Sequence, residues 1–270
     1  MRDSSKFVEL KFSNNIWAIG SIHSHLKSFE SIKEHIINNF SPSDKLIFLG
    51  NIIGLGSMAK ETLSSVIDMR HKLMSKFFLK PEDVVFIRGA QEEMLLKLLQ
   101  LQTAPNPSEI VKWMFEHGVD KTVISYGLSS EELSEISKHG TLAISKWTSN
   151  LNKLIALKKG HKEYFSHLHH AAFSSSKKIL FVNRGVDISR PLSAQNDCFW
   201  WGYHNFSKLN KPYSTFEKIV RGYQPSSNKS NDIFNNNIVC SLYKGPIANN
   251  TILAGLFNDS GKILDLFESK

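Results

Sequence analysis

The sequence predicts an α/β fold built around a sizeable hydrophobic core. Over the first hundred residues, short apolar runs alternate with longer amphipathic stretches, which is the pattern of repeated strand and helix. Hydrophobic residues make up 41% of the 270 positions, with 18 Phe, 6 Tyr and 5 Trp, so global disorder is excluded. No apolar run approaches the roughly 18 residues that a membrane-spanning helix needs.

Three strands and three helices are predicted in the first hundred residues. The strands are apolar runs at 16–20, 45–49 and 84–87. The helices are amphipathic stretches at about 26–39, 58–78 and 92–100. Each strand is followed by a helix, as in a sheet that is covered by helices on one face.

The second part of the chain changes character. Residues 103–175 contain several helical stretches, and we expect them to form a helical insertion within a single domain that spans residues 1–270. Beyond the insertion, strands are predicted at 179–183, 218–221, 237–242, 251–257 and 262–267. The polar stretch 225–236 is expected to be a mobile loop.

The distribution of charge and the two cysteines argue against several classes of function. The net charge of +8 comes from 27 Lys and six Arg, and the Lys are spread along the chain in pairs at most. A nucleic-acid surface favours clustered Arg and Lys with interleaved aromatic residues, so we do not expect a nucleic-acid partner. Cys198 and Cys240 indicate neither a disulfide framework nor a metal-type pair. Without a signal-peptide core at the N-terminus, we expect a cytoplasmic protein with no membrane partner.

Glycine-containing segments follow five of the predicted strands. They lie at 20–24, 50–56, 88–92, 183–185 and 221–225. The carboxyl ends of strands are where α/β folds bind ligands. Glycine by itself only permits a tight turn, so each segment taken singly has a structural explanation.

Taken together, the five segments resemble the motifs of calcineurin-like metallophosphoesterases, in particular bacterial serine/threonine protein phosphatases and diadenosine tetraphosphatases. That family carries D-x-H-G, G-D-x-x-D-R-G, G-N-H-E, H-A-G and G-H-T-P in the same order. The resemblance covers about residues 14–267 and implies a two-sheet β-sandwich flanked by helices. It also implies two divalent cations, such as Mn or Fe/Zn, roughly 3.5–4 Å apart, which clamp the phosphate and activate a water.

Most residues at the matching functional positions are replaced. The family's metal-ligand positions correspond to Ser21, His23, Asn51, Ala90, Asn183 and Tyr223, of which only His23 is the family's residue. The orienting Asp corresponds to Gly54, the phosphate-binding Arg to Leu55 and the protonating His to Gln91. Two hard cations need anionic oxygens, so we expect no metal cofactor. Glu92 is retained and is expected to start a helix.

We therefore interpret the chain as a catalytically inactive metallophosphoesterase-fold protein, a pseudophosphatase that binds a phosphorylated ligand or a partner protein. The alternative is an active metal-dependent phosphoesterase or protein phosphatase with a rearranged site. A third reading is decay, in which the chain still folds but has no selected function.

Three of the six arginines stand at motif positions. They are Arg88, Arg184 and Arg221. A guanidinium keeps its charge at physiological pH and matches phosphate oxygens, so we expect a metal-free anion site formed by these three. The opposing reading, in which each side chain points away from the site, stays open.

The histidines carry two further hypotheses. His23 is expected to be a neutral imidazole that hydrogen-bonds the backbone or Asn51, because one His alone does not hold a metal. His161, His167, His169 and His170 lie in the insertion. Glu163, His167 and His170 could share a helix face and bind a metal, but a solvated polar face is favoured.

Three residues after the insertion are expected to be structural. Trp200 and Trp201 are interpreted as core and rim packing rather than a stacking platform for a base. Cys198 has no activating partner in the sequence and is expected to be a buried, unreactive thiol.

Overall fold

The computed structural model describes residues 6–224, 237–244 and 250–269. The predicted loop at 225–236 lies outside the described residues. Among the described residues, no helix combines the length and the apolar character required to cross a membrane.

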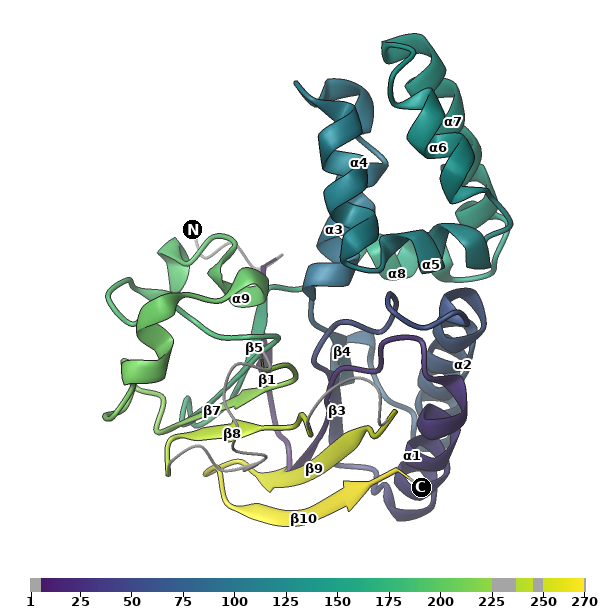
Figure 1. The fold of residues 1–270 in the computed structure, drawn as a ribbon. Helices are drawn as coiled ribbons and strands as arrows, with labels where there is room; N and C mark the ends of the chain where they lie inside the picture. The colour runs from purple at the N-terminus through teal and green to yellow at the C-terminus, as the bar shows by residue number, and fades with distance from the viewer. Residues whose placement is uncertain (1–5, 225–236, 245–249, 270) are drawn as a thin grey trace.

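Two five-stranded sheets form the centre of the molecule (Figure 1). One sheet has the order β10-β9-β2-β3-β4, with β2 (Asn15–Ile19), β3 (Lys45–Phe48), β4 (Val84–Phe86), β9 (Leu253–Asn258) and β10 (Ile263–Glu268). The other has the order β1-β5-β6-β7-β8, with β1 (Phe7–Leu10), β5 (Ala171–Ser174), β6 (Ile179–Val182), β7 (Lys218–Arg221) and β8 (Val239–Ser241). The predicted two-sheet α/β architecture is confirmed, and every predicted strand is present.

The core lies between the sheets because successive residues of a strand point to opposite faces. In β2, Ile16 and Ala18 join the cluster between the sheets, whereas Trp17 packs on the outer, helix-covered face. Phe181 of β6 meets Phe257 of β9 across the sandwich, with ring centroids 5.9 Å apart. Both faces of these strands are buried, which explains why they read as continuous apolar runs.

The helices α1 (Leu26–Asn39) and α2 (Ala59–Phe77) cover the outer face of the β2 sheet, and α3 (Ala90–Leu98) leads from the end of β4 toward the insertion (Figure 1). All three are close to their predicted bounds. On the outer face of the other sheet lie short elements: 3-10 turns at Leu192–Ala194 and His204–Lys208, and α9 (Cys198–Trp201); a further 3-10 turn, Pro81–Asp83, directly precedes β4. Phe199, Trp200 and Phe206 pack against that sheet. Trp200 and Cys198 are buried, as expected, and Trp201 is half-buried at the rim.

The insertion is a lobe of five helices above one end of the sandwich (Figure 1). They are α4 (Pro107–Glu116), α5 (Val119–Ser125), α6 (Ser130–Ile136), α7 (Thr141–Ala156) and α8 (His161–Ser166), preceded by a 3-10 turn at Leu101–Thr103. The predicted end of the insertion at residue 175 is wrong, because β5 (Ala171–Ser174) already belongs to the second sheet and pairs with β1.

His161 ties this lobe to the body. It is fully buried, with Nδ1 2.6 Å from the Tyr126 hydroxyl and Nε2 3.0 Å from Ser64 Oγ on α2. His161 is therefore a structural residue of the contact between the lobe and α2. The shared helix face is wrong, because α8 ends at Ser166 and His170 instead packs on Trp200, with ring centroids 5.0 Å apart.

Candidate functional site

The five glycine-containing segments meet at one edge of the sandwich. Parallel strands β2, β3 and β4 end there, as do β6 and β7 of the second sheet. Backbone hydrogen bonds join the segments across both sheets, from Ser21 N to Gly222 O (2.9 Å), His23 N to Asn51 O (2.8 Å) and Tyr223 N to Asn183 O (2.9 Å). Gly20 permits this approach, because a Cβ there would lie 2.0 Å from Leu242 O.

The side chains at three metal-ligand positions bond to neighbouring protein groups. Asn51 donates from Nδ2 to Ser21 Oγ (3.2 Å), and its Oδ1 accepts from Gln91 N (3.1 Å). Asn183 donates from Nδ2 to Leu49 O (2.6 Å). Ser21, Asn51 and Asn183 are all buried. Their polar atoms therefore largely serve to hold the loops together.

His23 occupies an apolar and desolvated position. Its side chain is 3% exposed, and neither ring nitrogen has a hydrogen-bond partner among the described residues. Burial lowers the pKa of His23 to about 3, so the ring is neutral at physiological pH. The expected hydrogen bond to Asn51 or the backbone is therefore wrong. Instead, the ring packs edge-on against Tyr223, with centroids 5.7 Å apart.

Gln91 and Gly54 form a coupled pair. A Cβ at Gly54 would lie 2.0 Å from Gln91 Oε1, so the Gln91 side chain fills the space above this glycine. Gln91 Nε2 donates to His117 O in the insertion (2.9 Å). A side chain that replaces the family's general acid therefore holds the insertion against the site.

Glu92 does more than start a helix. It is fully buried and accepts hydrogen bonds from the backbone N–H groups of Gly89 (3.0 Å), Asn51 (2.8 Å), Ile52 (2.8 Å) and Ile53 (3.4 Å), and from the Tyr164 hydroxyl (3.2 Å). Burial raises the pKa of Glu92, and the backbone N–H groups offset part of that rise. We call Glu92 and these five donors the Glu92 clamp; it fixes the loop after β3 to the start of α3.

Two of the three arginines lie at the ends of neighbouring parallel strands, since Arg221 of β7 pairs with Val182 of β6, two residues before Arg184. Arg221 is 7% exposed, donates from Nε to Ser241 Oγ (2.6 Å), and lies over the Phe206 ring. Burial and the neighbouring positive charge of Arg184 lower the pKa of Arg221 to about 10. Arg184 is half-buried, with its guanidinium carbon 5.8 Å from the centre of the Tyr223 ring.

Arg88 is placed differently. Its Nη1 forms an ion pair with Glu93 (3.0 Å), and its guanidinium lies over the Trp200 ring. The strand pairing therefore places Arg184 beside the end of β7, whereas Arg88 has a carboxylate of its own in Glu93.

The residues present do not fit a pair of divalent cations. Positions 21, 51, 90, 183 and 223 supply a hydroxyl, two amides, a phenol and, at Ala90, no donor atom. Glu92 is a carboxylate within these segments, but both of its oxygens already accept hydrogen bonds from backbone N–H groups and from the Tyr164 hydroxyl. Two hard cations would keep their charge uncompensated here. In the described ranges, no three His, Cys, Asp or Glu side chains gather as a metal-binding group.

Two aromatic residues near the site were not predicted as site residues from the sequence. Tyr243 follows β8 and stacks near Tyr223, with ring centroids 4.9 Å apart. Trp113 of α4 meets Trp201 at 5.8 Å, which connects the insertion to α9. The end of the predicted strand at 237–242 was a signal for Tyr243, since ligand-binding residues follow strand ends.

Comparisons with known proteins identify the fold. No family model and no curated protein matches this sequence. Among solved structures, a putative diadenosine tetraphosphatase superposes with a TM-score of 0.53 at 14% identity, over 98% of both chains. The chain has the metallophosphoesterase fold. A protein serine/threonine phosphatase from Saccharomyces cerevisiae with similarity to a human phosphatase gives a TM-score of 0.51 at 14% identity, over 98% of this chain and 83% of that one. At this identity, the similarity concerns the fold and not the activity.

Proposed function

We propose that this protein is a cytoplasmic pseudophosphatase, which binds a phosphorylated ligand at the altered phosphoesterase site without hydrolysing it. The observation that carries the proposal is the position of Arg184 and Arg221 at the ends of the neighbouring parallel strands β6 and β7, where the metallophosphoesterase fold would place its cations. A second observation supports the absence of hydrolysis: the side chains at positions 21, 51 and 183 are bonded to neighbouring protein groups.

Hydrolysis in this fold needs a metal-activated water and a proton donor for the leaving group. The donor set described above cannot balance the charge of two cations. Gln91, at the position of the proton donor, is an amide that cannot transfer a proton and is engaged with His117 O. Both requirements of the reaction are thus missing at the same site.

Anion binding needs only the two guanidiniums. Each presents a planar set of N–H donors that matches two phosphate oxygens, and such charge-assisted bonds are about twice as strong as neutral ones. Burial and, after it, repulsion from Arg184 lower the pKa of Arg221, and an anion near both cations relieves the repulsion. The burial of Arg221 and the partial burial of Arg184 strengthen the attraction of the anion, because water screens it less.

The test is the effect of inorganic phosphate on the melting temperature of chelator-treated protein. Binding to the folded state raises the melting temperature as phosphate concentration rises. We expect the Arg184→Ala/Arg221→Ala variant to lose this shift. Arg190→Ala is the control and keeps it, because the guanidinium of Arg190 already pairs with Asp187 (3.0 Å).

A milder variant guards against misfolding. Arg184 is half-buried, so Arg184→Gln removes the charge but keeps a long polar side chain. It should weaken the phosphate shift while keeping the melting temperature without phosphate. If wild type and both arginine variants respond equally to phosphate, the site does not bind anions. Binding of an unphosphorylated partner protein, or loss of function, then replaces the proposal.

A further inference from the structure

The Arg184 side chain has two neighbours that lead to aromatic rings. The first is the Tyr223 ring, 5.8 Å from the guanidinium carbon, which itself contacts Tyr243 with ring centroids 4.9 Å apart. The second is Gly202, where a Cβ would stand only 2.9 Å from Arg184 Nε. Gly202 directly follows Trp201, so the Arg184 side chain lies against the end of α9.

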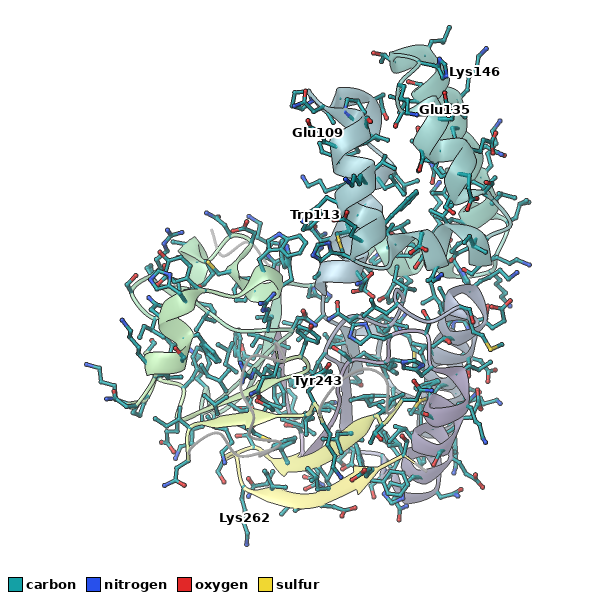
Figure 2. The ribbon with its side chains drawn as sticks, viewed as in Figure 1. Glu109, Trp113, Glu135, Lys146, Tyr243 and Lys262 are labelled. Atoms are coloured by element: carbon teal, nitrogen blue, oxygen red, sulfur yellow. The ribbon has the colours of Figure 1, made fainter. Side chains whose placement is uncertain are left out.

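The second neighbour leads through Trp201 to the insertion. Trp201 meets Trp113 of α4 at 5.8 Å, and Trp113 lies 4.3 Å from the His117 ring. Trp113 is 42% exposed and His117 is exposed as well, so this aromatic surface is open to a ligand. Trp113 and Tyr243 come from different parts of the chain, α4 and the segment after β8 (Figure 2).

We propose that the site prefers a phosphate monoester whose organic part is a flat aromatic ring. This inference rests on the proposed function, since it assigns the phosphate to Arg184 and Arg221. With the phosphate on Arg184, the substituent on the ester oxygen reaches the Tyr243 side or the Trp113 side. A flat ring can stack on either, whereas a short aliphatic group cannot.

The expected preference follows from the stacking contribution. Stacking of a ring on an aromatic side chain strengthens binding by at least roughly fivefold, and a tenfold gain lies in the lower part of its range. The aromatic rings also have few rotatable bonds, so little conformational entropy is lost when a ligand binds. The phosphate group of an aromatic and of an aliphatic ester is attracted by the same charges. The difference between the affinities of the two esters therefore measures the contribution of the aromatic rings.

The experiment is calorimetric titration of the chelator-treated full chain with phenyl phosphate and methyl phosphate. We expect phenyl phosphate to bind about tenfold more tightly. In Trp113→Ala/Tyr243→Ala, the ratio of the two dissociation constants should fall to about one, while the affinity for inorganic phosphate stays as in wild type. Leu142→Ala is the matched control, since Leu142 is a 71% exposed apolar residue of α7 in the same lobe.

The outcomes separate this inference from the proposed function. If phosphate binds but phenyl and methyl phosphate bind equally, the aromatic preference is overturned and the pseudophosphatase proposal stands. If the preference survives in the double variant, the assigned residues are wrong. If no phosphate compound binds, the proposed function itself fails. Titration with adenosine monophosphate and with phosphotyrosine amide then shows whether the ring belongs to a nucleotide or to a tyrosyl side chain.

Discussion

Replacement of Glu92 by glutamine tests the Glu92 clamp directly. The carboxylate accepts on both oxygens: Oε2 from the N–H groups of Asn51 and Gly89, and Oε1 from the N–H groups of Ile52 and Ile53 and from the Tyr164 hydroxyl. Glutamine has nearly the same shape but only one acceptor oxygen. Whichever way its amide is oriented, the NH₂ group faces two backbone N–H donors and leaves them without an acceptor in a fully buried position.

The magnitude follows from those two lost bonds. A hydrogen bond to a charged group contributes about 1.5–3 kcal/mol, so two of them are worth about 3–6 kcal/mol. Burial of the charge raises the pKa of Glu92, which means that the neutral amide recovers part of this loss. We therefore expect Glu92→Gln to lower the free energy of unfolding by about 3 kcal/mol, a large share of the ~5–15 kcal/mol that stabilises a typical domain.

Urea unfolding monitored by tryptophan fluorescence measures this loss. Glu93→Gln is the control, because glutamine at 93 still offers an oxygen to Arg88, and we expect it to cost about 1 kcal/mol or less. A Glu92→Gln variant that is no less stable than Glu93→Gln would refute the assignment of Glu92 as the residue that fixes these loops.

Three further predictions concern the metals, the chemistry and the pH response. Elemental analysis of protein purified with Mn²⁺ should show well under one tightly held metal per chain, and two would contradict the pseudophosphatase proposal. Hydrolysis of aryl phosphates and phosphopeptides should stay at background in wild type and in Ser21→Asp/Asn51→Asp, since the remaining ligand positions still lack anionic donors; turnover that follows the protein through purification would contradict this. The folded-state pKa of His23 is lowered to about 3, so below its unfolded value of about 6.5 the unfolded chain binds the proton first and stability falls. Between pH 7 and pH 5 this loss is about 2 kcal/mol, and urea unfolding of His23→Leu should show a correspondingly smaller difference between the two pH values.

The periodicity of the sequence was sufficient to predict the bounds of elements that bury one face. Phe29, Ile32 and Ile36 recur at helical spacing, and α1 begins and ends where that pattern predicts. In contrast, Ala171–Ser174 falls within the range predicted as the helical insertion, although it forms β5. Its strand character depends on pairing with β1, more than 160 positions earlier in the chain, which no local pattern encodes.

For the site, the order of the turn segments was enough to predict that they lie together, and their hydrogen bonds agree. The partners of individual side chains were not predictable. Glu92 is joined by Tyr164, 72 residues away, and His23 loses its expected partner because Asn51 bonds to Ser21 and Gln91 instead. Competition among neighbours for a donor or acceptor is a property of the folded arrangement.

The Glu92 clamp also protects Asn51 against deamidation. Spontaneous deamidation of an asparagine begins when the backbone nitrogen of the next residue attacks the side-chain amide carbon. Here that nitrogen belongs to Ile52, and its N–H is held by Glu92 Oε1 at 2.8 Å. The attack requires the nitrogen to leave this hydrogen bond and the buried loop to rearrange. Slow conversion of Asn51 to aspartate, which would return a negative charge to the position of the family's bridging ligand, is therefore suppressed for as long as the protein stays folded.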